Sequence, residues 1–173
     1  MKMDLLYSRE AIEIRIRELA DMISRDYEGR ELVAIGILKG AFIFMADLIR
    51  HLHVPCTVDF ARLASYGAAS ASSGKVIMTK DIETSIAGRD ILIIEDIIDS
   101  GITMNFIHGW FSERNPRSLK VCTFLDKRLR RKMPFEADYV GFTMDDGFVV
   151  GYGLDFDEKS RFLPDVYIVR DLD

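Results

Sequence analysis

The chain lacks the features that mark secreted, membrane-spanning and disulfide-stabilised proteins. Its 173 residues include two cysteines, four prolines and one tryptophan. Cys56 and Cys122 lie in separate apolar runs without CxxC spacing, which predicts two buried thiols in a reducing compartment. No window approaches the roughly 18 uninterrupted apolar residues of a membrane span, and no signal-peptide core follows Met1. We therefore expect a cytoplasmic protein.

The charge balance narrows the classes of partner. The 23 basic and 28 acidic residues give a net charge of -5, which argues against a general nucleic-acid or membrane surface. The three histidines are scattered, so neither a metal cluster nor a Ser/His/Asp triad is predicted. With 49% hydrophobic residues, the chain suits one domain, residues 1–173, with a sizeable core.

Helices and strands are predicted to alternate along the chain. Helical spacing of apolar residues and turn signals place helices at 8–27, 41–52 and 105–114, and strands at 32–38, 57–65, 76–78, 91–94, 118–125 and 138–143. This order predicts an α/β fold, a doubly wound and mainly parallel sheet flanked by helices, with a small appended region. In such sheets ligands bind at the carboxyl ends of the strands.

The most informative stretch is residues 91–103. Four apolar residues typical of a buried strand run into the adjacent acids Glu95 and Asp96, whose like charges are costly unless a cation or ligand hydroxyls compensate them. Small and hydroxyl residues at 99–103 then precede a helix, where backbone N–H groups form an anion site. The stretch therefore predicts a polyol or metal site beside a phosphate site.

Each part of this stretch also has a simpler structural explanation. Asp99 or Ser100 would serve as a helix cap, Gly101 as a turn glycine, and the acid pair as solvated side chains. Their occurrence together, in register behind a buried strand, favours the ligand site. The spacing lacks the lysine and glycines of a P-loop, which argues against a nucleotide triphosphatase.

Three further segments carry candidate site residues. Lys39 and Gly40 lie between a strand and a helix, where a plain turn explains the glycine but not the lysine. Lys127 follows a strand and would otherwise be an ordinary surface charge. Residues 148–155 are, taken alone, most simply a buried strand.

Taken together, these segments resemble the type I phosphoribosyltransferases, and most strongly the bacterial hypoxanthine (hypoxanthine-guanine) phosphoribosyltransferases. The resemblance runs from about residue 32 to residue 161. It rests on Leu-Lys-Gly at 38–40, Ser-Tyr-Gly at 65–67, Glu-Asp-Ile-Ile-Asp-Ser-Gly at 95–101, Leu-Asp-Lys-Arg at 125–128, Val-Gly-Phe at 140–142 and Phe-Val-Val-Gly-Tyr-Gly-Leu-Asp at 148–155.

The resemblance implies a purine salvage enzyme that transfers a phosphoribosyl group from phosphoribosyl pyrophosphate to hypoxanthine or guanine. Glu95 and Asp96 would hold the ribose hydroxyls near magnesium, and Asp155 would lie near a second magnesium shell. Asp99 would be the catalytic acid/base for the purine N7 proton. The loop that cradles the 5'-phosphate would comprise Asp99, Ser100, Gly101, Ile102 and Thr103.

The resemblance also assigns the pyrophosphate and purine contacts. Leu38, Lys39 and Gly40 would form the pyrophosphate loop, often with a cis peptide before the lysine, and Arg161 would touch pyrophosphate. Phe148 would stack on the purine, Lys127 would donate to its 6-oxo group, and the Val149 backbone would contact the ring edge. Ser65 and Tyr66 would begin a lid over residues 65–75.

The partners implied are small-molecule substrates, phosphoribosyl pyrophosphate and a purine base, with Mg²⁺ as cofactor, and a homo-oligomer (dimer or tetramer) without nucleic acid or membrane. Two other classes stay open. A pyrimidine-operon regulator with uracil phosphoribosyltransferase activity would need a basic RNA-binding face, whereas this chain is acidic. A nonenzymatic purine-sensing module would be expected to lose the acidic pair, and both acids are present.

Overall fold

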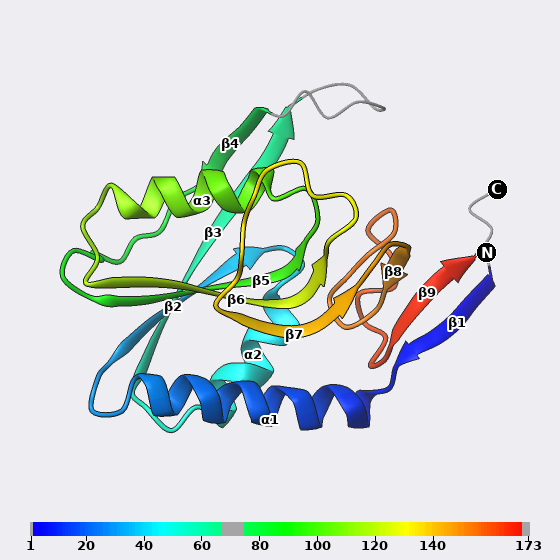
Figure 1. Ribbon diagram of the computed structural model, residues 1–173, viewed down its shortest axis with the longest axis horizontal. Helices are drawn as coiled ribbons and strands as arrows, with labels where there is room; N and C mark the ends of the chain where they lie inside the picture. Colours follow the sequence, from blue (N-terminus) through cyan, green and yellow to red (C-terminus); the bar gives the residue numbers. More distant parts are fainter. Residues whose placement is uncertain (1, 67–74, 171–173) are drawn as a thin grey trace.

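The computed structural model describes residues 2–66 and 75–170 and contains a six-stranded sheet and a three-stranded sheet (Figure 1). The elements in chain order are β1 (Lys2–Tyr7), α1 (Arg9–Asp26), β2 (Leu32–Leu38), α2 (Phe42–His51), β3 (Cys56–Tyr66), β4 (Lys75–Lys80), β5 (Asp90–Ile98), α3 (Ile102–Ser112), β6 (Ser118–Lys127), β7 (Tyr139–Met144), β8 (Phe148–Val150) and β9 (Val166–Arg170).

The larger sheet has the strand order β4-β3-β2-β5-β6-β7. Strands β3, β2, β5, β6 and β7 are parallel, and β4 pairs antiparallel with β3 at one edge. From β2 the chain moves outward to β3 and β4, and from β5 it moves the opposite way to β6 and β7. The strand order therefore reverses between β2 and β5, which is where an open α/β sheet binds its ligand. The predicted fold class is confirmed.

Two apolar cores cover the two faces of this sheet. Alternate residues of β2 point to opposite faces, so Leu32 and Ala34 join the core beneath α1 and α2 whereas Val33 and Ile35 join the core beneath α3. Figure 1 shows α3 on one side of the sheet and α1 and α2 on the other. Burial on both faces explains why β2 and residues 91–94 of β5 are continuous runs without a polar side chain.

The smaller sheet, ordered β1-β9-β8 and antiparallel, brings the two ends of the described chain together (Figure 1). The sequence predicted only a small appended region here and missed β1 and β9 as strands. Both are short, and neither forms a turn-linked hairpin with its partner, because β1 and β9 come from opposite ends of the chain. Their pairing is therefore a long-range contact without a local sequence signal.

Strand β5 is longer than the apolar run at residues 91–94 predicted. Pairing between β2 and β5 ends at Gly36 and Ile94, but pairing between β5 and β6 continues to Ile98. Glu95 and Asp96 therefore lie on the strand, beyond the end of its pairing with β2, rather than after the strand. Helix α3 likewise begins earlier than predicted, at Ile102 rather than residue 105.

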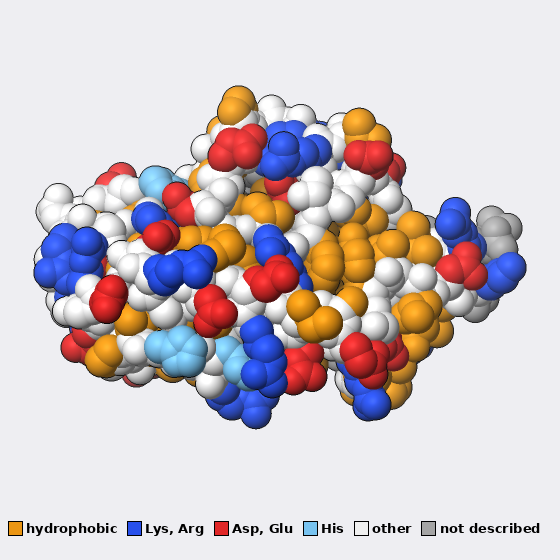
Figure 2. Space-filling view, turned by 60° about the horizontal axis from the view of Figure 1, so that its bottom comes forward, with side chains coloured by type: hydrophobic (Ala, Val, Ile, Leu, Met, Phe, Trp, Pro, Cys, Tyr) orange, Lys and Arg blue, Asp and Glu red, His pale blue; other side chains and the backbone are white. Residues whose placement is uncertain are grey.

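The surface shown in Figure 2 carries acidic and basic side chains interspersed with each other, and hydrophobic side chains emerge between them. Attraction of a charged ligand to the face seen in Figure 2 would therefore depend on local groups rather than on one large field of a single sign.

Within residues 2–66 and 75–170, no helix is both long enough and apolar enough to cross a bilayer.

A buried carboxylate stabilises the sheet at the amino ends of its parallel strands, opposite the carboxyl ends where such sheets bind ligands. The side chain of Asp90, the first residue of β5, is 0% exposed. It accepts hydrogen bonds from Arg117 Nε at 3.0 Å and from Ser118 Oγ at 2.6 Å. The hydrogen bond from Arg117 lowers the pKa of the Asp90 carboxyl below its ordinary value, although burial opposes that change.

Asp90→Asn should lower the free energy of unfolding by about 1–3 kcal/mol at pH 7, because an amide cannot accept the charge-assisted bonds equally well. The pKa of the Asp90 carboxyl is lower in the folded than in the unfolded state. Its contribution to stability is therefore fully present above the unfolded-state pKa of about 3.9, and it is lost as the pH falls through the folded-state pKa. Urea unfolding at pH 7 and below pH 4 would measure this, with Glu113→Gln at an exposed site as the control. An equal effect of both substitutions at pH 7 would contradict it.

Candidate active site

A cavity of about 490 Å³ opens at the carboxyl ends of β2 and β5, at the switch point of the sheet. Its volume lies within the range of ordinary small-molecule sites. It brings together residues that are far apart in the sequence, including the following predicted site residues: Leu38, Lys39, Gly40, Ser65, Glu95, Asp96, Thr103, Asp155 and Arg161.

A second cavity of about 220 Å³ adjoins the first and is formed by the loop between β5 and α3. The two cavities share Ile97 and Thr103, and the smaller one is also lined by Asp99, Ser100 and Gly101. Ile102 is the first residue of α3, so the loop lies at the N-terminus of an 11-residue helix. Free N–H groups and the helix dipole favour an anion at this position.

The helix-cap explanation of Asp99 is wrong. The N-cap of α3 is Gly101, which has a φ of 80° and makes no side-chain capping bond. The Ser100 hydroxyl accepts a bond from Ile102 N at 3.3 Å. Among the described residues, Asp99 Oδ1 is buried and has no hydrogen-bond partner. A buried polar atom left unpaired by the protein is a candidate to meet a ligand.

The loop is held in place by a segment that the sequence did not mark as functional. Arg131 donates from Nε to Asp99 O at 3.0 Å and from Nη2 to Lys127 O at 3.0 Å. The backbone N–H groups of Lys132 and Met133 both donate to Ser100 O, at 2.8 and 3.0 Å. In the sequence, the basic residues around Arg131 resemble solvated surface charges. No local signal therefore indicated that the Arg131 guanidinium links the loop to the end of β6.

The acid pair is electrostatically costly in the absence of a ligand. Glu95 is 6% exposed, and burial raises the pKa of its carboxyl well above the ordinary value, with the charge of Asp96 raising it further. Burial also raises the pKa of Asp96, although the charge of Arg161 opposes this. Two neighbouring carboxyl groups whose charged forms lack full compensation are suited to bind a cation or hydroxyl donors.

Gly40 allows the acid pair to approach the end of β2. A Cβ at Gly40 would overlap the Asp96 carboxylate, so only glycine leaves room for it. The preceding Leu38–Lys39 peptide bond is cis, as the resemblance implied. A Cβ at Gly153 would in turn overlap the carbonyl oxygen of Gly40, so the loop after β8 packs directly on this turn.

Two cations and two acids form a network at the cavity. Arg161 bonds to Asp155 Oδ1 at 2.8 Å and donates from Nη1 to Gly153 O at 2.7 Å. Lys39 Nζ donates to Glu158 Oε2 at 2.8 Å. The Arg161 side chain is 19% exposed, whereas those of Lys39 and Glu158 are 47% and 63% exposed. The sequence did not indicate Glu158, which is one of several acids in a polar turn.

The predicted purine contacts are not among the residues that line the two cavities at the switch point. Lys127 ends β6 and is 5% exposed, and its burial lowers the pKa of its ammonium group. It pairs with Met144, the last residue of β7, shortly before Phe148 begins β8. Phe148 is 36% exposed and packs edge-on against Phe156, with ring centroids 5.2 Å apart. Val149 is buried and pairs with Ile168 of β9.

A sequence model described as the phosphoribosyl transferase domain matches residues 3–157. The chain is 46% identical over 171 residues to hypoxanthine-guanine phosphoribosyltransferase of Aquifex aeolicus, covering 98% of this chain and 96% of that protein. It is 46% identical over 173 residues to the Bacillus subtilis protein of the same name, with the same coverage. A crystal structure of a Bacillus anthracis hypoxanthine-guanine phosphoribosyltransferase superposes with a TM-score of 0.92 at 47% identity, covering 96% of this chain and 98% of that one.

The chain belongs to the hypoxanthine-guanine phosphoribosyltransferase family. The resemblance found from the motifs is thereby confirmed over nearly the whole chain. Of the lid predicted at residues 65–75, residues 67–74 lie outside the described part of the structure. Ser65 lines the cavity of about 490 Å³ at the switch point, and Tyr66 is the last residue of β3.

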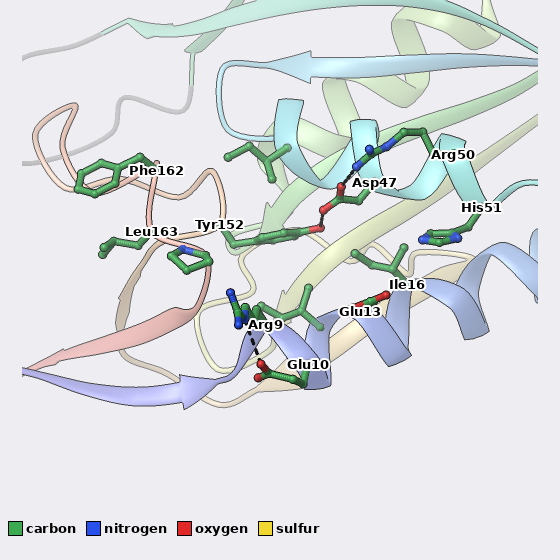
Figure 3. Close-up of a pocket in the computed structure, with 13 residues that line it drawn as sticks. Arg9, Glu10, Glu13, Ile16, Asp47, Arg50, His51, Tyr152, Phe162 and Leu163 are labelled. Carbon is green, nitrogen blue, oxygen red and sulfur yellow. Dashed lines mark hydrogen bonds and ion pairs between the residues drawn. The ribbon is translucent and has the colours of Figure 1, made fainter.

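The phosphoribosyltransferase also has a larger cavity, of about 740 Å³, between α1, α2 and the loop after β8 (Figure 3). Its charged side chains are already paired, Arg9 with Glu10 and Arg50 with Asp47. Figure 3 shows Tyr152 pointing to Asp47, to which its hydroxyl donates at 2.6 Å. None of the predicted site residues lines this cavity, whereas nine of them line the cavity of about 490 Å³ at the switch point.

Gly40→Ala should lower kcat/KM for phosphoribosyl transfer by about 10²-fold, because the new methyl group displaces the Asp96 carboxylate from its position. The fold should persist, since a side-chain end can rotate away. Gly109→Ala is a matched control, because Gly109 lies in α3 with no atom within 4 Å of an added Cβ. The control should keep full activity and gain up to about 1 kcal/mol in stability. Steady-state kinetics and thermal unfolding would measure both, and an active Gly40→Ala variant would contradict the expectation.

Proposed function

We propose that the protein transfers the 5-phosphoribosyl group from phosphoribosyl pyrophosphate to hypoxanthine or guanine, giving IMP or GMP and pyrophosphate. The observation that carries this proposal is the joined pair of cavities at the switch point. The anion loop lines the smaller of the two, and the acid pair, Lys39 and Arg161 line the other. These groups match a donor that carries a phosphate, a diol and a diphosphate.

The loop at residues 99–103 would bind the 5'-phosphate, because it lies at the N-terminus of α3. Glu95 and Asp96 would accept hydrogen bonds from the ribose hydroxyls. Lys39, the N–H groups around Gly40, and Arg161 would then face the diphosphate. Cations and N–H groups at this position would stabilise the negative charge that develops on the leaving group.

The acids present fit a magnesium ion that arrives with the donor. Among residues 2–66 and 75–170, no group of three or more His, Cys, Asp or Glu side chains is arranged to hold a metal ion. Glu95, Asp96 and Asp155 nevertheless line one cavity, and burial and the charge of Asp96 raise the pKa of Glu95. Mg²⁺ typically binds through one or two carboxylates plus substrate phosphates, and when bound it neutralises charge on the diphosphate.

Asp99 is the proposed acid/base. As the bond to pyrophosphate breaks, the ribose gains positive charge and the purine loses a proton from N7. Asp99 lines the smaller cavity, and its Oδ1 is buried without a partner among the described residues, so the atom is available to take that proton. Its backbone carbonyl is fixed by Arg131, which would keep the carboxylate in place.

The purine would be read by Lys127, Phe148 and Val149. Lys127 is nearly fully buried and has only hydrogens to donate, so it suits a 6-oxo group. Phe148 keeps part of its ring exposed for stacking. The backbone of Val149 would contact the ring edge. The homo-oligomeric state stays a prediction from the resemblance, and the cytoplasmic location stays a prediction from the composition of the sequence.

The test of this function is a turnover assay with phosphoribosyl pyrophosphate, Mg²⁺ and a panel of nucleobases. Hypoxanthine or guanine should be converted to the nucleotide at least about 10²-fold faster than adenine, because Lys127 would meet the 6-amino group of adenine donor to donor. Product formation followed by chromatography would measure this. Equal rates for adenine and hypoxanthine, or turnover of uracil alone, would refute the proposed specificity.

Asp99→Asn should lower kcat by about 10² to 10⁴-fold while changing donor affinity only a few-fold. The amide keeps the size of the side chain but cannot accept the N7 proton. Single-turnover kinetics would report the chemical step, and calorimetry would report donor binding as an internal control. If the variant keeps kcat within about threefold, well below that range, Asp99 is not the acid/base.

A further inference from the structure

The turn between Asp155 and Arg161 places an acid of the protein itself on the cations of the cavity. Glu158 Oε2 lies 2.8 Å from Lys39 Nζ, and its other oxygen lies 3.5 Å from Arg161 Nη2. The bond from Lys39 lowers the pKa of the Glu158 carboxyl below its ordinary value, so it stays ionised near neutral pH. An anionic carboxylate thus bonds to the two side chains that the diphosphate is proposed to meet.

The two cations differ in how firmly the protein holds them. Arg161 also bonds to Asp155 and to the carbonyl of Gly153, and its side chain is 19% exposed. Lys39 donates its hydrogen bond to Glu158, and the Lys39 side chain is 47% exposed. Departure of Glu158 would therefore leave Arg161 in position while making the Lys39 ammonium available to another anion.

The geometry of the turn allows that departure at low cost. The Glu158 side chain is 63% exposed, and ion pairs at such exposure contribute little to stability. Its backbone N–H donates to Asp155 Oδ2 at 2.8 Å, so the main chain stays anchored when the side chain rotates. Asp157, Glu158 and Ser160 all have positive φ values, between 51° and 70°. Non-glycine residues in this left-handed region are uncommon and cluster at functional sites.

We propose that Glu158 is an internal competitor of the diphosphate. The Glu158 carboxylate binds Lys39 when the site is empty and is displaced when the donor or pyrophosphate binds. This inference rests on the proposed function. The competition lowers the affinity for pyrophosphate and so favours release of this product. Glu158 is a positioning residue for Lys39 and takes no part in the chemical step.

The test measures binding of inorganic pyrophosphate with Mg²⁺ by calorimetry, without any base. Glu158→Gln should tighten binding about two- to fivefold, the range expected when one exposed ion pair no longer competes. Asp157→Asn is the matched control, since it removes the same charge from the adjacent residue, which pairs with Lys159 at 3.7 Å. The control should change affinity by less than about 1.5-fold, below the lower end of that range.

A double-mutant cycle with Lys39→Met shows whether the effect acts through the lysine. In the Lys39→Met background, Glu158→Gln should leave pyrophosphate affinity unchanged. Two results would overturn the proposed competition while leaving the proposed function intact. One is unchanged or weaker pyrophosphate binding by the Glu158→Gln variant alone, and the other is equal tightening by Asp157→Asn. Absence of pyrophosphate binding in the unsubstituted protein would overturn both.

Discussion

The acid pair at the end of β5, with Glu95 buried and Asp96 half-buried, is the constraint on which the rest of the site depends. Glu95 and Asp96 are placed beyond the pairing of β5 with β2, at the point where the strand order reverses. Their charges are costly there, as the raised pKa values of both carboxyl groups indicate. Gly40 is needed so that the Asp96 carboxylate fits at all. Lys39, Arg161 and the anion loop line the cavities beside this pair.

A second constraint is that the loops of the site stabilise each other rather than stand alone. Arg131 joins the phosphate loop to the end of β6 through the carbonyls of Asp99 and Lys127. Gly153, after β8, packs on the Gly40 carbonyl and is bonded to Arg161. A substitution in either supporting segment would therefore move groups that it does not touch. Such coupling is typical of sites whose geometry has to be held within a fraction of an ångström.

The success of the sequence-based interpretation depended on whether a feature is local. The buried strand, the acid pair and the small-residue loop are contiguous in residues 91–103, so their pattern predicted the strand correctly, and the anion site it predicts stays a proposal. The length of β5 was underestimated, because its last residues are strand only through pairing with β6. Strands β1 and β9 were missed since each needs a partner from the opposite end of the chain. Glu158 and Arg131 had no local signal, because their partners are distant in sequence.

The α/β class and the family could be predicted from the amino-acid sequence, because apolar periodicity and short motifs are set by neighbouring residues. How the motifs meet in space follows from the folded structure. Parallel strands end at one edge of the sheet, so Lys39, Glu95 and Arg161 come to line one cavity although they are far apart along the chain. The structure also showed that Asp99 caps no helix and that Glu158 bonds to Lys39. Such contacts depend on the folded path of the chain, which no local pattern encodes.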